Sequence, residues 1–145
     1  MRGVRLGIDV GGVRVGVAVS DPDGVLATPV ATLRRDTEGT PPSDMAEIAR
    51  LIGEYQAVEV VIGLPVNLAG VEGPAARGVR EYAQVLGELI APVPVRLTDE
   101  RMSTVVARRR LSDRGVRGRR QRAVIDQVAA VEILQAWLEA RRRRT

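Results

Sequence analysis

Three strand patterns follow one another in the first third of the chain, and this succession limits the possible folds more than any other feature of the sequence. Apolar residues dominate 4–10, 13–20 and 25–33. A glycine pair at 11–12 and an Asp-Pro-Asp-Gly stretch at 21–24 separate the three segments, and both are turn signals. Because connections this short cannot contain a crossover helix, the segments are predicted to form an antiparallel meander.

Beyond residue 33 the pattern changes to single strands that alternate with single helices. A first helix is predicted to begin at Ser43, which would cap it, since Met45, Ile48 and Ile52 recur at the helical period. The remaining segments predict strands at 58–62 and 93–97, helices at 74–90, 103–111 and 123–140, and a Gly- and Arg-rich loop at 112–121. Strands joined through helices run parallel, with right-handed crossovers. The sequence therefore predicts one α/β domain over residues 1–145, with a mixed five-stranded sheet flanked by helices.

The residue types that the chain lacks exclude several kinds of chemistry. The sequence contains no Cys, His, Lys or Phe. Without His and Cys, it cannot form a Ser-His-Asp triad, a cysteine nucleophile or an ordinary zinc site. Without Lys, it has neither a Schiff-base amine nor a P-loop lysine. The carboxylates that remain are ligands that Mg²⁺ prefers, so metal-assisted phosphoryl chemistry is the enzyme class that the composition best supports.

Asp9 is the first candidate ligand, because it is a carboxylate inside an otherwise apolar strand pattern. An ionised aspartate among buried strand residues costs free energy unless a cation or hydrogen-bond donors compensate it. The alternative is a turn aspartate whose oxygens accept backbone N–H bonds beside the glycines at 11–12.

Two further candidate positions follow later in the chain. Glu100 and Asp99 lie just after the predicted strand at 93–97, and ligand sites gather at the carboxyl ends of parallel strands. Both acids could instead form a loop ion pair with Arg101. Asp126 lies near the start of the last predicted helix, where small residues one turn later would let the helix approach a strand closely. Asp126 could also do no more than complement the helix dipole.

The net charge of +4 is unevenly distributed along the chain. Residues 1–100 contain 9 Arg and 14 acidic residues, a balance of −5, whereas residues 101–145 contain 13 Arg and 4 acidic residues, a balance of +9. Guanidinium groups bind phosphate oxygens in a bidentate manner, so the last third is expected to bind nucleic acid in a salt-dependent way. The candidate phosphate contacts are Arg108, Arg109, Arg114, Arg117, Arg119, Arg120 and Arg122. The run at 141–144 is the weaker candidate, because it could be a disordered end, and all these residues could simply solvate helix faces or a surface loop.

Four sequence blocks resemble a known family. They are GIDVGGVRVGVAVSD from Gly7, VIGLPVNLAGVEGP from Val61, TDERMSTVVA from Thr98 and, more weakly, VIDQVAAVEILQAWL from Val124. In this order and spacing the chain resembles the ribonuclease-H-like superfamily of nucleases and resolvases. Within it, the match is closest to the bacterial YqgF family, also named RuvX, described as Holliday-junction resolvases or pre-16S ribosomal RNA nucleases. The blocks cover the chain almost from end to end.

The resemblance implies a ribonuclease-H-like fold in which Asp9, Glu100 and Asp126 form the acidic site and hold Mg²⁺ or Mn²⁺. These ions would activate a water and stabilise the leaving oxygen. The better-known resolvases of the superfamily usually place a carboxylate at the end of the fourth strand. In this chain the corresponding residues, 63–67, include no acidic residue. Glu100, one strand later, would have to take over that role.

Residues beside the acidic site are expected to contact the substrate. Arg101 could stabilise negative charge that develops on the scissile phosphate. Gly63 and Asn67 would let the loop after the fourth strand approach the sugar-phosphate backbone, and a plain turn is an equal alternative for Asn67.

The function that the resemblance implies is a metal-dependent nuclease acting on structured RNA, with precursor 16S ribosomal RNA as the substrate. Cleavage of four-way DNA junctions is the second interpretation; it generally needs a symmetric dimer, and the sequence leaves a monomer or a homodimer open. A non-catalytic nucleic-acid-binding protein would need only the Arg clusters. The glycine-rich first hairpin also resembles a phosphate loop of the actin and sugar-kinase fold, which leaves a small ATPase as a further alternative.

The sequence also predicts where the protein works. Its apolar stretches stay well short of the ~18 residues of a membrane span, and its first residues predict a strand rather than a signal peptide. The missing cysteines agree with a reducing compartment. A soluble, cytoplasmic protein is therefore expected.

Overall fold

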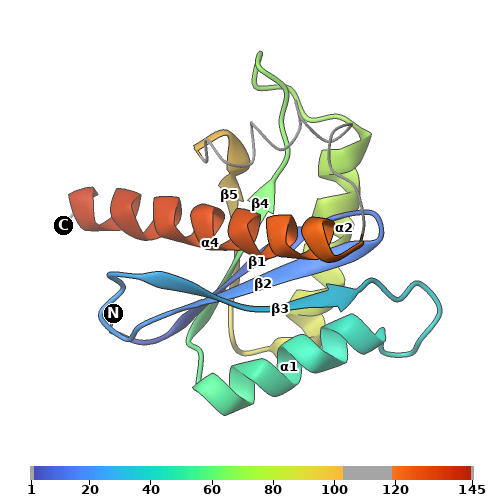
Figure 1. Cartoon of the computed structure of the whole chain (residues 1–145), viewed down its shortest axis with the longest axis horizontal. Coiled ribbons are helices and arrows are strands. Elements are labelled where there is room, and N and C mark those ends of the chain that lie inside the picture. The colour runs from blue at the N-terminus through green and yellow to red at the C-terminus, as the bar shows by residue number, and fades with distance from the viewer. Residues whose placement is uncertain (1, 103–118, 145) are drawn as a thin grey trace.

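The structure, a computed structural model, describes residues 2–102 and 119–144 of the chain. Five strands, three α-helices and one 3₁₀ turn follow one another in these residues (Figure 1). They are β1 (Arg5–Val10), β2 (Arg14–Ser20), β3 (Ala27–Arg34), α1 (Ser43–Tyr55), β4 (Glu59–Leu64), α2 (Pro74–Ile90), β5 (Val95–Asp99), η1 (Glu100–Met102) and α4 (Arg119–Arg144). No described helix is long and apolar enough to cross a membrane.

The strands form one mixed sheet in the order β3-β2-β1-β4-β5. β1 pairs antiparallel with β2, and β2 pairs antiparallel with β3, as the short turns between them require. β4 pairs parallel with β1 and with β5, because a helix precedes each of the strands β4 and β5. The predicted meander beside parallel strands is therefore confirmed.

Helices cover both faces of this sheet (Figure 1). On one face, Leu6 and Ile8 of β1 and Ile62 of β4 are buried in a core with residues of α1 and α2. On the other face, Val61 packs with the apolar stripe of α4 that includes Leu134. Since side chains alternate between the faces of a strand, residues 5, 7 and 9 of β1 all face α4.

Small residues let α4 lie close against the sheet. Ala129 and Ala130 of α4 are fully buried. On the strand below them, a Cβ added at Gly7 would lie 2.6 Å from Leu134 Cβ and 3.0 Å from the Ala130 carbonyl oxygen. This close contact explains why β1 carries a glycine in the middle of an apolar pattern.

Helix ends differ from the sequence-based expectation in two places. Pro42 rather than Ser43 occupies the N-cap position of α1, where no side chain caps the helix. The Asp36 carboxylate instead accepts a hydrogen bond from the Ser43 N–H at 2.8 Å. α4 begins at Arg119 and extends to Arg144, so it is longer than the helix predicted at 123–140. The predicted helix at 103–111 and most of the loop at 112–121 lie outside the described residues.

Candidate active site

Asp9 occupies the α4 face of β1, close to the carboxyl end of the strand. Only 3% of the residue is exposed. Its partner across the antiparallel ladder is Gly16 of β2. On the other side the parallel register pairs Ile8 with Ile62, so the next step of the ladder sets Gly63 of β4 beside Asp9. The buried carboxylate thus lies inside β1, in a row between two glycines, and its role as a metal ligand stays a prediction.

The glycine on the β2 side makes room for Asp126. A Cβ added at Gly16 would collide with the Asp126 carbonyl oxygen and lie 2.6 Å from its carbonyl carbon and 3.3 Å from its Cβ. The first turns of α4 therefore lie directly over Gly16, next to Asp9. The Asp126 carboxylate accepts a hydrogen bond from Arg14 Nε at 2.7 Å, in a half-buried ion pair. Arg14, two residues before Gly16 on the same face of β2, was not predicted as a site residue.

The glycine on the β4 side makes room for Glu100. Glu100 begins η1 directly after β5 and is 4% exposed. A Cβ added at Gly63 would lie 3.4 Å from Glu100 Cβ and 2.7 Å from Ile133 Cδ1 of α4. The prediction that Gly63 belongs to the loop after the fourth strand was wrong. It lies inside β4, and its lack of a side chain accommodates Ile133 and Glu100.

The structure therefore brings Asp126 and Glu100 to the two sides of Asp9. All three side chains offer only oxygen atoms as ligands, which is the chemistry that Mg²⁺ and Mn²⁺ prefer, and the two flanking glycines let Asp126 and Glu100 approach the sheet closely. Among residues 2–102 and 119–144, no three acidic side chains are already arranged to hold a metal ion. The Asp126 carboxylate binds Arg14. The shared metal site stays a prediction.

Asp99 and Glu100 have different environments although they are neighbours. Asp99 forms a partly exposed ion pair with Arg101, whose guanidinium donates to it at 2.6 and 2.9 Å. The hydrogen bond from Arg101 holds the pKa of the Asp99 carboxyl below its ordinary value. The alternative of a loop ion pair thus applies to Asp99, whereas Glu100 is buried.

Arg101 and Asn67 together shape the loop that follows β4. Asn67 Oδ1 accepts hydrogen bonds from the N–H groups of Ala69 and Val71, both at 2.9 Å, so the Asn67 side chain closes a turn. Arg101 Nη1 donates to the carbonyl oxygens of Asn67 at 3.2 Å and Leu68 at 3.3 Å. Asp99 thereby orients Arg101, and Arg101 fixes this loop beside the carboxyl end of β5.

The predicted phosphate contacts fall in two parts of the chain. Arg108, Arg109, Arg114 and Arg117 lie outside the described residues, and Arg119, Arg120 and Arg122 belong to the first turns of α4. The run 141–144 belongs to the last turn of α4 rather than to a disordered end. There Arg141 donates to Glu59 at 2.9 Å, and Arg142 donates to the Gly24 carbonyl oxygen.

Substitution of Gly16 by alanine is expected to damage the site through packing alone. The added Cβ meets the backbone of Asp126, so α4 must move away from Asp9, at a cost of about 1–3 kcal/mol. Urea unfolding and nuclease assays would measure both losses. Gly53→Ala in α1 is the control, because a Cβ there meets nothing within 4 Å and alanine favours a helix. Equal stability of the two variants would contradict the role assigned to Gly16.

The sheet order and the helices on both faces define the class of the protein as ribonuclease-H-like in fold. Among solved structures, Thermus thermophilus RuvC matches this chain with a TM-score of 0.54 at 14% sequence identity. The match covers 97% of this chain and 96% of the RuvC chain. The complex of T. thermophilus RuvC with a Holliday junction substrate gives a TM-score of 0.58 at 15% identity, with 96% of each chain covered. At this level of identity the likeness establishes the fold, and the fold prediction is confirmed.

The family follows from the sequence comparisons. The family model of RuvX, described as Holliday junction resolvase, matches residues 3–140. A relative from Frankia casuarinae is 59% identical over 139 residues, which are 96% of this chain and 68% of that protein. A relative from Mycobacteroides abscessus is 58% identical over 142 residues, 98% of this chain and 84% of that protein. Both carry the provisional name pre-16S rRNA nuclease. The chain belongs to the RuvX family, as predicted.

Proposed function

We propose that this protein is a divalent-metal-dependent nuclease that hydrolyses phosphodiester bonds of structured RNA, with pre-16S ribosomal RNA as its substrate. The observation that carries the proposal is the buried Asp9 between two glycines, with Asp126 of α4 on one side and Glu100 on the other. The names of the relatives supply the substrate.

In this proposal Asp9, Glu100 and Asp126 hold the metal ions at the carboxyl end of β1 and β4. When bound, Mg²⁺ or Mn²⁺ lowers the pKa of a water and stabilises the leaving oxygen. The chain's own part is to fix the ligands before substrate arrives. Burial of Asp9 and Glu100 limits their motion, and Arg14 holds the Asp126 carboxylate at the start of α4. Fixed ligands reduce the reorganisation that the transition state would otherwise require.

The surroundings of the acidic row would position the RNA. Arg101 is oriented by Asp99 and remains partly exposed, so its charge is available to the scissile phosphate. The turn that Asn67 closes lies beside it and would contact the sugar-phosphate backbone. The first turns of α4, with Arg119, Arg120 and Arg122, would bind flanking phosphates.

The direct test compares three end-labelled nucleic acids: a structured precursor 16S ribosomal RNA fragment, duplex DNA and a four-way DNA junction. Each is incubated with Mg²⁺, with Mn²⁺ or with a chelator, and the products are mapped. We expect metal-dependent cleavage of the RNA at defined positions and no cleavage with chelator. Binding without cleavage under any metal would contradict the proposal and support a non-catalytic nucleic-acid-binding protein.

Cleavage of Holliday junctions is the second candidate, and the description of the matching family favours it. Resolution cuts two strands symmetrically, which generally needs a symmetric dimer. The same assay separates the two functions, since a resolvase would cut the junction in preference to the RNA. Sedimentation of the protein with and without junction adds a second criterion, because a monomer in both conditions would speak against resolution.

A further inference from the structure

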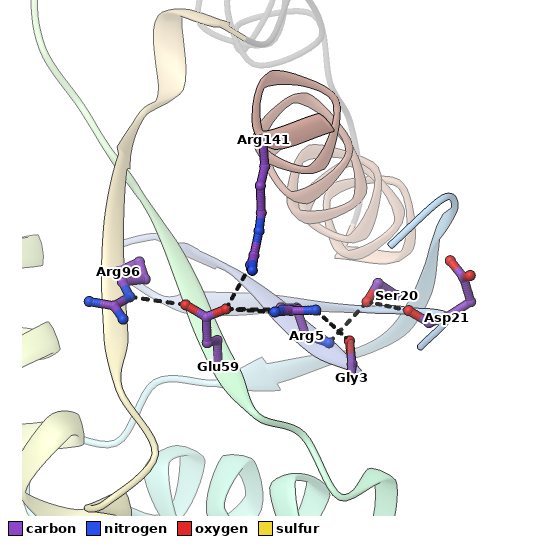
Figure 2. A network of polar contacts seen from close by, with 7 residues as sticks. All are labelled: Gly3, Arg5, Ser20, Asp21, Glu59, Arg96 and Arg141. Atoms are coloured by element: carbon purple, nitrogen blue, oxygen red, sulfur yellow. Dashed lines mark hydrogen bonds and ion pairs between the residues drawn. The ribbon is translucent and has the colours of Figure 1, made fainter. Parts of the chain in front are cut away.

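A buried carboxylate at the start of β4 binds three guanidinium groups (Figure 2). Glu59 is 7% exposed. Its Oε1 accepts hydrogen bonds from Arg5 Nε at 3.0 Å and from Arg141 at 2.9 Å, and its Oε2 accepts one from Arg96 Nε at 3.0 Å. The three cations come from β1, α4 and β5. The cluster therefore joins the last turn of α4 to the sheet, at the end opposite to the acidic row.

This cluster carries more positive charge than its carboxylate can balance. One carboxylate against three guanidinium groups leaves a surplus of two positive charges. Arg5 is 3% exposed and also donates to the Gly3 carbonyl oxygen at 2.8 Å, so its guanidinium forms hydrogen bonds within the protein. The side chains of Arg96 and Arg141 are 56% and 34% exposed. Because like charges held together repel, an anion bound on this exposed side would be stabilising.

A pocket of about 300 Å³ opens beside these two side chains. Its lining residues are Glu59, Arg96, Trp137, Arg141 and Arg144, and we call it the distal basic pocket. The Arg141 guanidinium lies over the Trp137 ring, 5.3 Å from the ring centroid, so that face of the indole is already covered. The pocket therefore offers guanidinium donors rather than an open stacking surface, which suits a phosphate group better than a base.

The surplus of positive charge continues beyond this pocket. A second cavity of about 300 Å³ is lined by Arg2, Arg5, Arg141 and Arg142 and by one acid, Asp23, which pairs with Arg2 at 2.8 Å, so Arg142 adds a further positive charge there. Arg141 thus lies between two basic hollows at the end of α4. An extended polyanion fits such a surface better than a single small anion does, since successive charges can contact successive guanidinium groups.

We propose that the distal basic pocket binds the phosphodiester backbone of the nucleic acid that the acidic row cleaves. This inference rests on the proposed nuclease function and adds a second contact region to it. Residues 126 and 141 lie on one helix, about 22 Å apart along its axis at ~1.5 Å per residue. About six nucleotides of one strand of B-form DNA span that distance, and somewhat more of A-form RNA, which has a smaller rise per base pair. α4 would then set the spacing between the cleaved bond and the distal phosphates.

The test variant is Arg96→Gln combined with Arg144→Gln, which removes two exposed charges of the pocket and leaves Arg5 and Arg141 on Glu59. The matched control is Arg50→Gln combined with Arg143→Gln. Arg50 pairs with Glu47 and Glu54 on the exposed face of α1, and Arg143 lies in the last turn of α4 but lines neither cavity. The single variant Arg144→Glu serves as a second test if the double variant unfolds.

Trp137 supplies a readout that does not depend on catalysis, because it is the single tryptophan of the chain. In a background that carries Asp9→Asn, its fluorescence is titrated with RNA hairpins whose stems have about four or about twelve base pairs, so that only the longer stem spans the helix. Polyglutamate is the comparison ligand. Cleavage of the short hairpin by the pocket variants that retain Asp9 is measured in parallel.

We expect the long hairpin to change the Trp137 fluorescence and the short hairpin to leave it unchanged. The double variant should bind the long hairpin about tenfold more weakly, with a log–log salt slope smaller by about 1.4–1.8 for two lost phosphate contacts. Its cleavage of the short hairpin should equal that of the control. If the double variant and the control bind the long hairpin equally, or if polyglutamate changes the fluorescence and RNA does not, the inference is overturned even where cleavage occurs. Absence of cleavage by every protein with Asp9 intact would instead overturn the nuclease proposal.

Discussion

Substitution of Asp9 by asparagine is expected to lower the cleavage rate at least ~10³-fold while RNA binding is retained, since several kcal/mol of transition-state stabilisation would be lost. The side chain keeps its shape and remains in the row between Gly16 and Gly63, but it loses the charge that a divalent ion needs. Single-turnover cleavage and filter binding of the same RNA would measure the two effects separately.

Metal binding gives a second measurement on the same variant. An ion that binds only the folded protein raises its stability, by ~2.7 kcal/mol at a hundredfold excess over the dissociation constant. We expect Mn²⁺ to raise the melting temperature of the wild type and to have little effect on Asp9→Asn. Glu54→Gln is the control, because that carboxylate is exposed on α1. Full cleavage by Asp9→Asn, or an unchanged response to Mn²⁺, would contradict the assignment of Asp9 as a ligand.

Substitution of Glu59 by glutamine is expected to destabilise the protein by about 3–5 kcal/mol, the usual effect of removing one partner from a buried ion pair. Glutamine has a similar shape, but it leaves the buried Arg5 without a counter-charge and brings three guanidinium groups together around a neutral amide. Urea unfolding of wild type and variant would measure the difference.

Two controls separate this effect from the general loss of a glutamate. Glu47→Gln removes a carboxylate that also binds an arginine, but the pair with Arg50 is exposed on α1 and should contribute little. Adding Arg5→Met to Glu59→Gln removes the buried charge, so part of the lost stability should return. A loss below about 1 kcal/mol for Glu59→Gln would contradict a central role of this carboxylate.

The acid dependence of stability offers an independent test of Glu59. Burial by itself raises the pKa of the Glu59 carboxyl, but the hydrogen bonds from Arg96, Arg5 and Arg141 outweigh it and hold the pKa below the ordinary value of 4.5. A carboxyl whose pKa is lower in the folded protein stabilises the fold above its ordinary pKa, and this contribution is lost as the pH falls through the lower value. The stability difference between wild type and Glu59→Gln should therefore shrink as the pH falls below about 4.5.

Elements with local sequence signals could be predicted, and elements without them could not. The helix predicted at 74–90 has the bounds of α2, because a proline at its first position and a clear apolar stripe are both visible in the sequence. The start of α4 was missed by four residues, because the stretch Arg-Arg-Gln-Arg at 119–122 has no apolar periodicity.

The burial of Asp9 could be predicted because its apolar neighbours lie beside it in the sequence. The contact between Arg14 and Asp126 was not, because 112 positions separate the two residues and only the placement of α4 over β2 brings them together. The strand glycines did carry a signal, since a glycine inside a strand often marks a close approach of another backbone. For Gly16, however, no close approach of another backbone was predicted.

The sequence pattern around Glu59 also predicts a buried carboxylate. A carboxylate beside an apolar strand pattern was the argument that singled out Asp9, and Glu59 lies in the predicted strand at 58–62 with the same character. Its burial could therefore have been predicted from the sequence. Its three partners could not, because Arg5, Arg96 and Arg141 are 54, 37 and 82 positions away.

The alternation of side chains along β1 links the two ends of the molecule. Arg5, Gly7 and Asp9 face α4, whereas Leu6 and Ile8 face α1 and α2. A slip of β1 by one residue would exchange these two sets. It would move the candidate ligand Asp9 away from α4, separate Arg5 from Glu59 and remove Leu6 and Ile8 from the core. A chain that pairs this strand wrongly would therefore lose stability and the position of the candidate ligand together.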